Sequence, residues 1–125
     1  MRARSGHIIF DEKVRYEELE PIFREILTLF LEESGQMRDD QEFLEIILEE
    51  NLRDLRKGRK PEGFNREGTM RLIFPISERL EFYVYGRGEG VEVPQVTEAL
   101  SQFLRQKGLI HEVEWDTLLL FADNK

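Results

Sequence analysis

Apolar and polar residues alternate along three stretches in the second half of the chain. These stretches are residues 70–76, 80–85 and 111–121. A period of two places successive side chains on opposite faces of a β-strand, so the pattern predicts three strands with one apolar face each. The side chains expected to point toward the helices are Met70, Leu72, Phe74, Ile76, Leu80, Phe82, Val84, Val113, Trp115, Leu119 and Phe121. A short apolar run at residues 7–10 predicts a further strand, at an edge or at the start of the sheet.

Three other segments have the spacing of amphipathic helices. Residues 16–34 carry apolar side chains three and four positions apart, and Gly35 follows as a stop. The next segment begins at Asp39 or Asp40. Asp39 with Glu42 three positions on is a variant of the capping box, and the charges of the segment run from acidic to basic as the helix dipole favours. Residues 94–107 have Pro in the first turn and Gly108 after the end. We therefore expect three helices.

The resulting order of elements is β-α-α-β-β-α-β, which defines an α+β fold. We expect a four-stranded, mainly antiparallel sheet with the helices packed on one face. The order resembles the ferredoxin-like split arrangement, with an extra helix in the first crossover. We expect a single domain over residues 1–125, in which a flexible loop at residues 58–68 joins the helical N-terminal half to the ββαβ C-terminal half. Because this fold hosts unrelated functions, it does not indicate one.

Composition and charge narrow the classes of function. The absence of cysteine excludes disulfides, thiolate catalysis and zinc sites built on sulfur. No stretch has the apolar length of a signal peptide or of a membrane helix, so we expect a cytoplasmic protein. The net charge of −8 disfavours general nucleic-acid binding. The charge is uneven, because residues 11–50 carry a net −10 and residues 51–71 a net +4.

One glycine-rich turn could hold an anion. Gly86, Gly88 and Gly90 lie between a strand and a helix, where free backbone N–H groups can cradle a phosphate. The turn resembles the acyl-coenzyme A pyrophosphate loop of acetyltransferases at Arg87 and Gly90 and departs from it at Glu92. That resemblance implies an enzyme that binds a nucleotide or coenzyme A. The simpler interpretation is a strand-to-helix connection.

No pattern of catalytic residues accompanies the fold. His111 is expected on the core side of its strand, as a partly buried histidine with a backbone partner, and His7 is expected at the start of the first strand. The acids along the second helix lack the histidine three positions on that carboxylate metal sites in helical bundles use. We expect no catalytic residue, no metal and no cofactor.

The sheet face opposite the helices is the best candidate for a binding surface. It is expected to carry tyrosines and aliphatic side chains, which favour contact with a protein partner or with a second copy of the chain. Two basic residues that precede the second strand join the predicted contact set. That set is Ile73, Tyr83, Tyr85, Leu118, Leu120, Arg59 and Lys60. An open face with aromatics is also how RNA-recognition domains stack bases, although their glycine-aromatic consensus is missing here.

The sequence thus predicts a small non-catalytic domain that binds protein or regulates it, as a homodimer or with a partner. Three alternatives stay open. One is an enzyme that uses the Gly86–Gly90 turn, and the second is a nucleic-acid module that uses the basic cluster from Arg53 to Arg66. The third is an acidic inhibitor that neutralises a basic target through residues 11–50.

Overall fold

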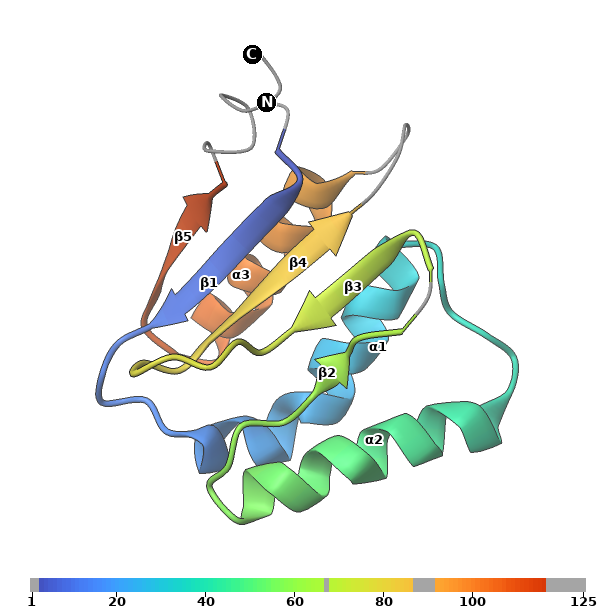
Figure 1. Cartoon of the computed structure of the whole chain (residues 1–125), viewed down its shortest axis with the longest axis horizontal. Coiled ribbons are helices and arrows are strands. Elements are labelled where there is room, and N and C mark those ends of the chain that lie inside the picture. The colour runs from blue at the N-terminus through green and yellow to red at the C-terminus, as the bar shows by residue number, and fades with distance from the viewer. Residues whose placement is uncertain (1–2, 67, 87–91, 117–125) are drawn as a thin grey trace.

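The computed structural model describes residues 3–66, 68–86 and 92–116 of the chain. It is an α+β fold with three α-helices and an open five-stranded antiparallel sheet (Figure 1). The elements in chain order are β1 (Ser5–Phe10), the 3-10 helix η1 (Tyr16–Ile22), α1 (Phe23–Glu33), α2 (Gln41–Arg56), β2 (Gly63–Phe64), β3 (Met70–Ile73), β4 (Glu81–Gly86), α3 (Val93–Gln106) and β5 (His111–Trp115).

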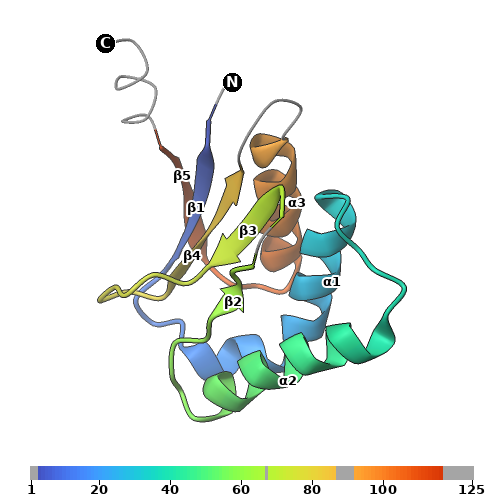
Figure 2. The same cartoon turned by 45° about the vertical axis from the view of Figure 1, so that its right-hand side comes forward.

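The strands lie in the order β2-β3-β4-β1-β5, so β1 is in the interior of the sheet and not at its edge. Burial alternates along β1, β3 and β4, as the period of two predicts. Figure 2 shows α1 and α3 together on one side of the sheet, with α2 crossing below α1. The sheet therefore has an inner face toward the helices and an outer face that no helix of the described residues covers.

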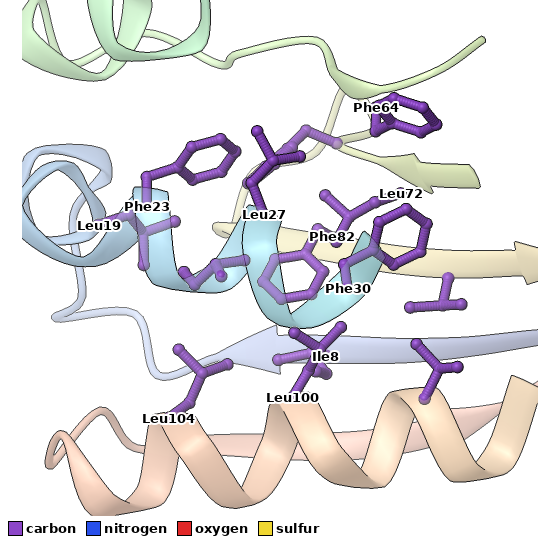
Figure 3. Close-up of a cluster of buried hydrophobic side chains, with 14 of the residues drawn as sticks. Ile8, Leu19, Phe23, Leu27, Phe30, Phe64, Leu72, Phe82, Leu100 and Leu104 are labelled. Atoms are coloured by element: carbon purple, nitrogen blue, oxygen red, sulfur yellow. The ribbon is translucent and has the colours of Figure 1, made fainter. Parts of the chain in front are cut away.

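Side chains from the strands and from the helices meet in one core between the sheet and the helix layer. Phe23, Leu27 and Phe30 of α1 lie against strand residues and against α3 (Figure 3). Ten of the core side chains are labelled in that view, and each of them is 5% exposed or less. Full burial of such a side chain stabilises the fold by about 1.5–3 kcal/mol. This contact holds the helix layer to the inner face.

The first predicted helix is divided in two. Residues Tyr16–Ile22 form a 3-10 helix, and the α-helix begins only at Phe23. Pro21 lies at this junction, and proline lacks the N–H that a continuous α-helix needs from an interior residue. The predicted single helix over residues 16–34 is therefore wrong at its first two turns, whereas Gly35, at φ 71°, ends α1 as expected.

The fifth strand lies in residues predicted as a loop. β2 pairs with β3 through Gly63 opposite Ile73 and Phe64 opposite Leu72. Phe64 is 5% exposed and packs against Phe30 and Phe43. The segment 58–68 is thus built into the core at its centre, and the prediction of a loop without structure is wrong there.

A side-chain amide attaches β2 to α2. Asn51, itself 2% exposed, accepts a hydrogen bond from the Gly63 N–H at 2.7 Å and donates one to the Gly63 carbonyl at 3.0 Å. Gln36 pairs in the same two-way manner with the backbone of Met70, at 3.0 and 3.2 Å. A primary amide offers a donor and an acceptor side by side, so each of these side chains pairs with both backbone groups of one residue, as a neighbouring strand would.

The helix layer approaches the sheet closely at Gly6. A Cβ atom at Gly6 would lie 2.3 Å from Thr97 Oγ1 on α3 and 2.7 Å from Trp115 Cζ3 on β5. No side chain larger than hydrogen fits at such distances without movement. Gly6 therefore sets how closely α3 rests on β1.

Two further predictions need correction. The alternation places Ile76 in the inner apolar set, but Ile76 lies in the turn between β3 and β4 and is 95% exposed. The strand ends at Ile73, Phe74 is still buried, and the alternation stops at Pro75. The cap of α2 is Asp40, whose carboxylate accepts from the Phe43 N–H at 3.1 Å, so the Asp39 alternative is wrong.

Replacing Asn51 by Ala should lower the free energy of unfolding by about 2–4 kcal/mol, because it leaves the buried N–H and C=O of Gly63 without partners. Urea unfolding followed by circular dichroism measures this change. Gln36→Ala is the matched control, since its contacts with Met70 are only partly buried and water can take them over. An Asn51 effect no larger than the Gln36 effect would contradict this role.

Gly6→Ala should destabilise the fold by about 1–3 kcal/mol, the usual cost of an overpacked core site. The double variant Gly6→Ala/Thr97→Ala should recover part of that loss, because it removes the Thr97 contact and keeps the one with Trp115. Thermal unfolding of the two variants and of Thr97→Ala alone gives the coupling. Additive effects in this cycle would show that Gly6 and Thr97 do not meet.

Candidate functional site: the outer face of the sheet

The outer face collects side chains from four strands, and the pairing register fixes their neighbours. Tyr85 lies opposite Ser5 and Arg71, whereas Tyr83 lies opposite His7 and Ile73. The outer-face residues are Ser5, His7, Ile9, Arg71, Ile73, Glu81, Tyr83, Tyr85, Glu112 and Glu114. Ile73, Tyr83 and Tyr85, three members of the predicted contact set, are thereby brought together.

The centre of the face is aromatic and aliphatic. The His7 and Tyr83 rings stack with centroids 4.8 Å apart and planes inclined by 24°. Tyr85, Ile73 and Ile9 surround this pair, and all of them are half-buried rather than exposed. Within the described residues no helix lies over them (Figure 2).

A line of polar groups crosses the face beside the aromatic pair. Ser5 Oγ lies 3.1 Å from His7 Nε2 and donates to Asp116 Oδ2 at 3.4 Å. On the other side of the ring, His7 Nδ1 lies 3.7 Å from Glu81 Oε2. Ser5 is only 3% exposed. A serine, a histidine and an acid in this order are also the residue types of a catalytic triad.

Burial keeps Ser5 from serving as a nucleophile. Its side chain lies between His7 Nε2 and Asp116 Oδ2, and the residue is 3% exposed. A substrate has to reach the oxygen of a nucleophilic serine, and a residue this buried does not offer that access. The line holds His7 in place beneath Tyr83.

The charges of the outer face differ from strand to strand. Glu112 and Glu114 are exposed on β5, at one edge, whereas Arg71 lies on β3. Glu81 is the first residue of β4, and its charge also affects Tyr16 on η1. Burial raises the pKa of Tyr16 above its usual value, and the negative charge of Glu81 adds to this rise.

Arg71 has unused capacity for hydrogen bonds. Its Nη1 donates to Asn65 Oδ1 at 3.2 Å. Its Nε is buried and has no hydrogen-bond partner among the described residues. A buried N–H without a partner costs free energy.

Arg59 and Lys60 do not belong to this surface. Both are exposed in the connection from α2 to β2, where Arg59 contacts Asp54 at 3.1 Å and Lys60 lies 3.4 Å from the Pro61 carbonyl. The predicted contact set therefore divides into two separate places.

Three of the six basic residues from Arg53 to Arg66 contact acids among the described residues. Arg56 contacts Glu20 at 3.0 Å and Glu49 at 3.6 Å, and the hydrogen bond from Arg56 to Glu20 raises the pKa of Arg56. Arg66 contacts Glu50 at 3.5 Å. Ion pairs of this kind reduce the field that a phosphate backbone would meet.

Other predicted residues lie elsewhere or outside the described residues. Leu118, Leu120 and residues 87–90 of the glycine-rich turn fall outside them. His111 lies on the inner face, where Nδ1 donates to the Leu109 carbonyl at 2.8 Å and Nε2 lies 2.7 Å from Ser101 Oγ. Both ring nitrogens are thus engaged in joining β5 to α3.

Neither a metal-binding cluster nor a membrane-spanning helix occurs among the described residues. Within residues 3–66, 68–86 and 92–116, no group of three or more His, Asp or Glu side chains is arranged to hold a metal ion. The helices in the same residues are too short or too polar to cross a membrane.

Sequence analysis missed the polar line at Ser5, His7, Glu81 and Asp116. These residues are far apart in the chain, and only the register of β1 with β4 and β5 brings them together. One sequence signal could have indicated this line. Ser5 and His7 are two positions apart, so they share one face of a strand.

Comparison with known proteins gives no match. No family model matches the chain, and neither a curated protein nor a solved structure matches it significantly.

Proposed function

We propose that this chain is a non-catalytic protein-binding domain that docks a protein on the outer face of its sheet. The observation that carries the proposal is the cluster of His7, Tyr83 and Tyr85 on the two adjacent strands β1 and β4, on the side that α1 and α3 leave uncovered. Tyrosine and other large, rigid side chains at the centre of a surface are the usual anchors of protein interfaces.

The outer face suits a protein better than a nucleic acid. Three carboxylates, Glu81, Glu112 and Glu114, lie on the same face as the tyrosines. They oppose the phosphates that any RNA or DNA strand would bring to an aromatic platform. The paired basic residues at the end of α2 do not compensate for them.

Catalysis finds little support in the geometry of the histidines. His7 lies beside Ser5 and His111 beside Ser101, and each of these serines is 3% exposed. A substrate has to reach a nucleophilic hydroxyl, and serines this buried do not offer that access. A binding role requires only the surface itself.

Two finer points belong to the same proposal. We infer a ferredoxin-like arrangement in which β2 is an added edge strand, because the four longer strands follow the order β3-β4-β1-β5 with α1 and α3 on one face. We also infer a cytoplasmic protein, for which the lack of cysteine in the whole chain is the support.

Replacing Tyr83 and Tyr85 together by Ala should weaken self-association or partner binding at least about tenfold, because anchor tyrosines contribute more than their share of binding energy. Sedimentation velocity measures self-association, and capture from the lysate of the native host measures partner binding.

Ile46→Ala is the matched control, since Ile46 is 51% exposed on α2 and its truncation removes an apolar group from the helical side. Circular dichroism checks that each variant is folded. If both the sedimentation and the capture of a folded Tyr83/Tyr85 variant equal those of the wild type, the outer face is not the binding surface.

A further inference from the structure

The outer face has a positive and a negative side. Arg71 lies on β3, and the exposed Glu112 and Glu114 lie on β5, with β4 and β1 between them. Neighbouring strands are about 4.8 Å apart, so roughly 14 Å separates the two sides. The tyrosine cluster lies midway between them.

This distribution of charge is complementary to itself under one two-fold rotation. Consider a second copy facing the first, with the symmetry axis between the two sheets, parallel to the strands and above the boundary of β4 and β1. The rotation places β3 of each copy over β5 of the other, and β4 over β1. Facing sheets pack about 10 Å apart, a gap that an arginine and a glutamate side chain can span.

The rows of the sheet then bring opposite charges together. The row of Arg71 continues through Tyr85 and Ser5 to Asp116, two residues beyond the outward-facing Glu114. Two residues span about 6.6 Å along a strand, a distance that the long arginine side chain can cover, so Arg71 of one copy comes within reach of Glu114 of the other, twice in each dimer.

Other ways of pairing two copies are disfavoured by the same charges. An axis perpendicular to the strands would place β5 over β5, with acids against acids. Pairing of two β5 edges side by side would likewise bring Glu112 and Glu114 of both copies together, and like charges opposite each other destabilise a strand pair. In a chain of net charge −8 such contacts have no compensation.

We propose that the occupant of the outer face is a second copy of this chain, in a two-fold dimer in which Arg71 of each protomer binds Glu114 of the other. This inference rests on the proposed function and names its partner. At the centre, Tyr83 of β4 then lies over His7 of the opposite β1 and Tyr85 lies over Ser5, so the two aromatic clusters face each other. The acidic and basic sides fix the orientation of the two copies.

Exchange of the two charges tests this dimer. The variants Arg71→Glu and Glu114→Arg each place like charges at both contacts, so each should raise the dimer dissociation constant about 100-fold or more. An equimolar mixture of the two variants should form a mixed dimer. One of its contacts joins the new glutamate at position 71 to the new arginine at position 114, and the other joins the unchanged Arg71 and Glu114. The single chain that carries both substitutions should also dimerise. Sedimentation velocity of the four samples and of the wild type measures these states.

Arg105→Glu and Glu98→Arg are the controls for net charge. Both residues are exposed on α3, on the opposite side of the sheet, and their substitutions change the charge of the chain by the same amounts. These controls should sediment as the wild type does. Should Arg71→Glu fail to fold, Arg71→Lys introduces an amine that carbodiimide can join to a carboxylate. Mixed ¹⁵N- and ¹⁴N-labelled chains then show whether the amine at position 71 is joined to Glu114 of another chain.

The outcomes separate this inference from the proposed function. A monomeric wild type, folded charge variants that stay dimeric, or a mixture that stays monomeric would each overturn the two-fold dimer. If lysate capture still depends on Tyr83 and Tyr85 in such a case, the outer face binds a different protein and the proposed function stands. If neither self-association nor capture depends on the tyrosines, both proposals are wrong.

Discussion

A single helix layer has to bury the apolar side of a five-stranded sheet, and this constraint determines the remaining structure. α1 and α3 lie on the inner face and contact each other as well as the strands. Gly6 lets α3 rest directly on β1, because only a hydrogen atom fits between the backbone of β1 and the side chains of Thr97 and Trp115. With both helices on one side, the described helices leave the side chains of the outer face without cover.

The two connections that carry helices cover the sheet in different ways. The first runs from β1 through α1 and α2 to β3, and the second runs from β4 through α3 to β5. α3 lies directly on β1 and β4, whereas α2 lies beside η1 and α1 and reaches the sheet through β2. Asn51 makes that connection by pairing with Gly63, and Phe64 fills the space between α1 and α2. The extra helix thereby extends the helix layer and adds an edge strand, and the outer face keeps its four long strands.

Much of this fold follows from local patterns, and the rest depends on contacts between distant residues. The alternation in β3 and β4 and the glycine stops after α1 and α3 predict their elements because burial and capping act within a few residues. β2 has only two residues, and its existence depends on Asn51, twelve positions earlier, so no pattern could indicate it. Ile76 continues an alternating pattern and yet lies in a turn, because Pro75 interrupts the ladder.

The candidate site shows the same division. The spacing of Tyr83 and Tyr85 alone predicts both tyrosines on the uncovered face. The stacking of His7 on Tyr83, the line from Asp116 to Glu81 and the separation of charge between β3 and β5 all require the strand order and register. A single sequence does not contain that information, since a change of register by one residue exchanges the two faces of a strand.

Hydroxyl-radical labelling of the three tyrosines at increasing protein concentration tests the central claim most directly. Tyr83 and Tyr85 lie on the outer face, and Tyr16 on η1 provides an internal reference within the same chain. The account predicts that labelling of Tyr83 and Tyr85 falls as the concentration rises and that labelling of Tyr16 stays constant. Equal labelling of Tyr83 and Tyr85 at every concentration would contradict the presence of a second copy on the outer face.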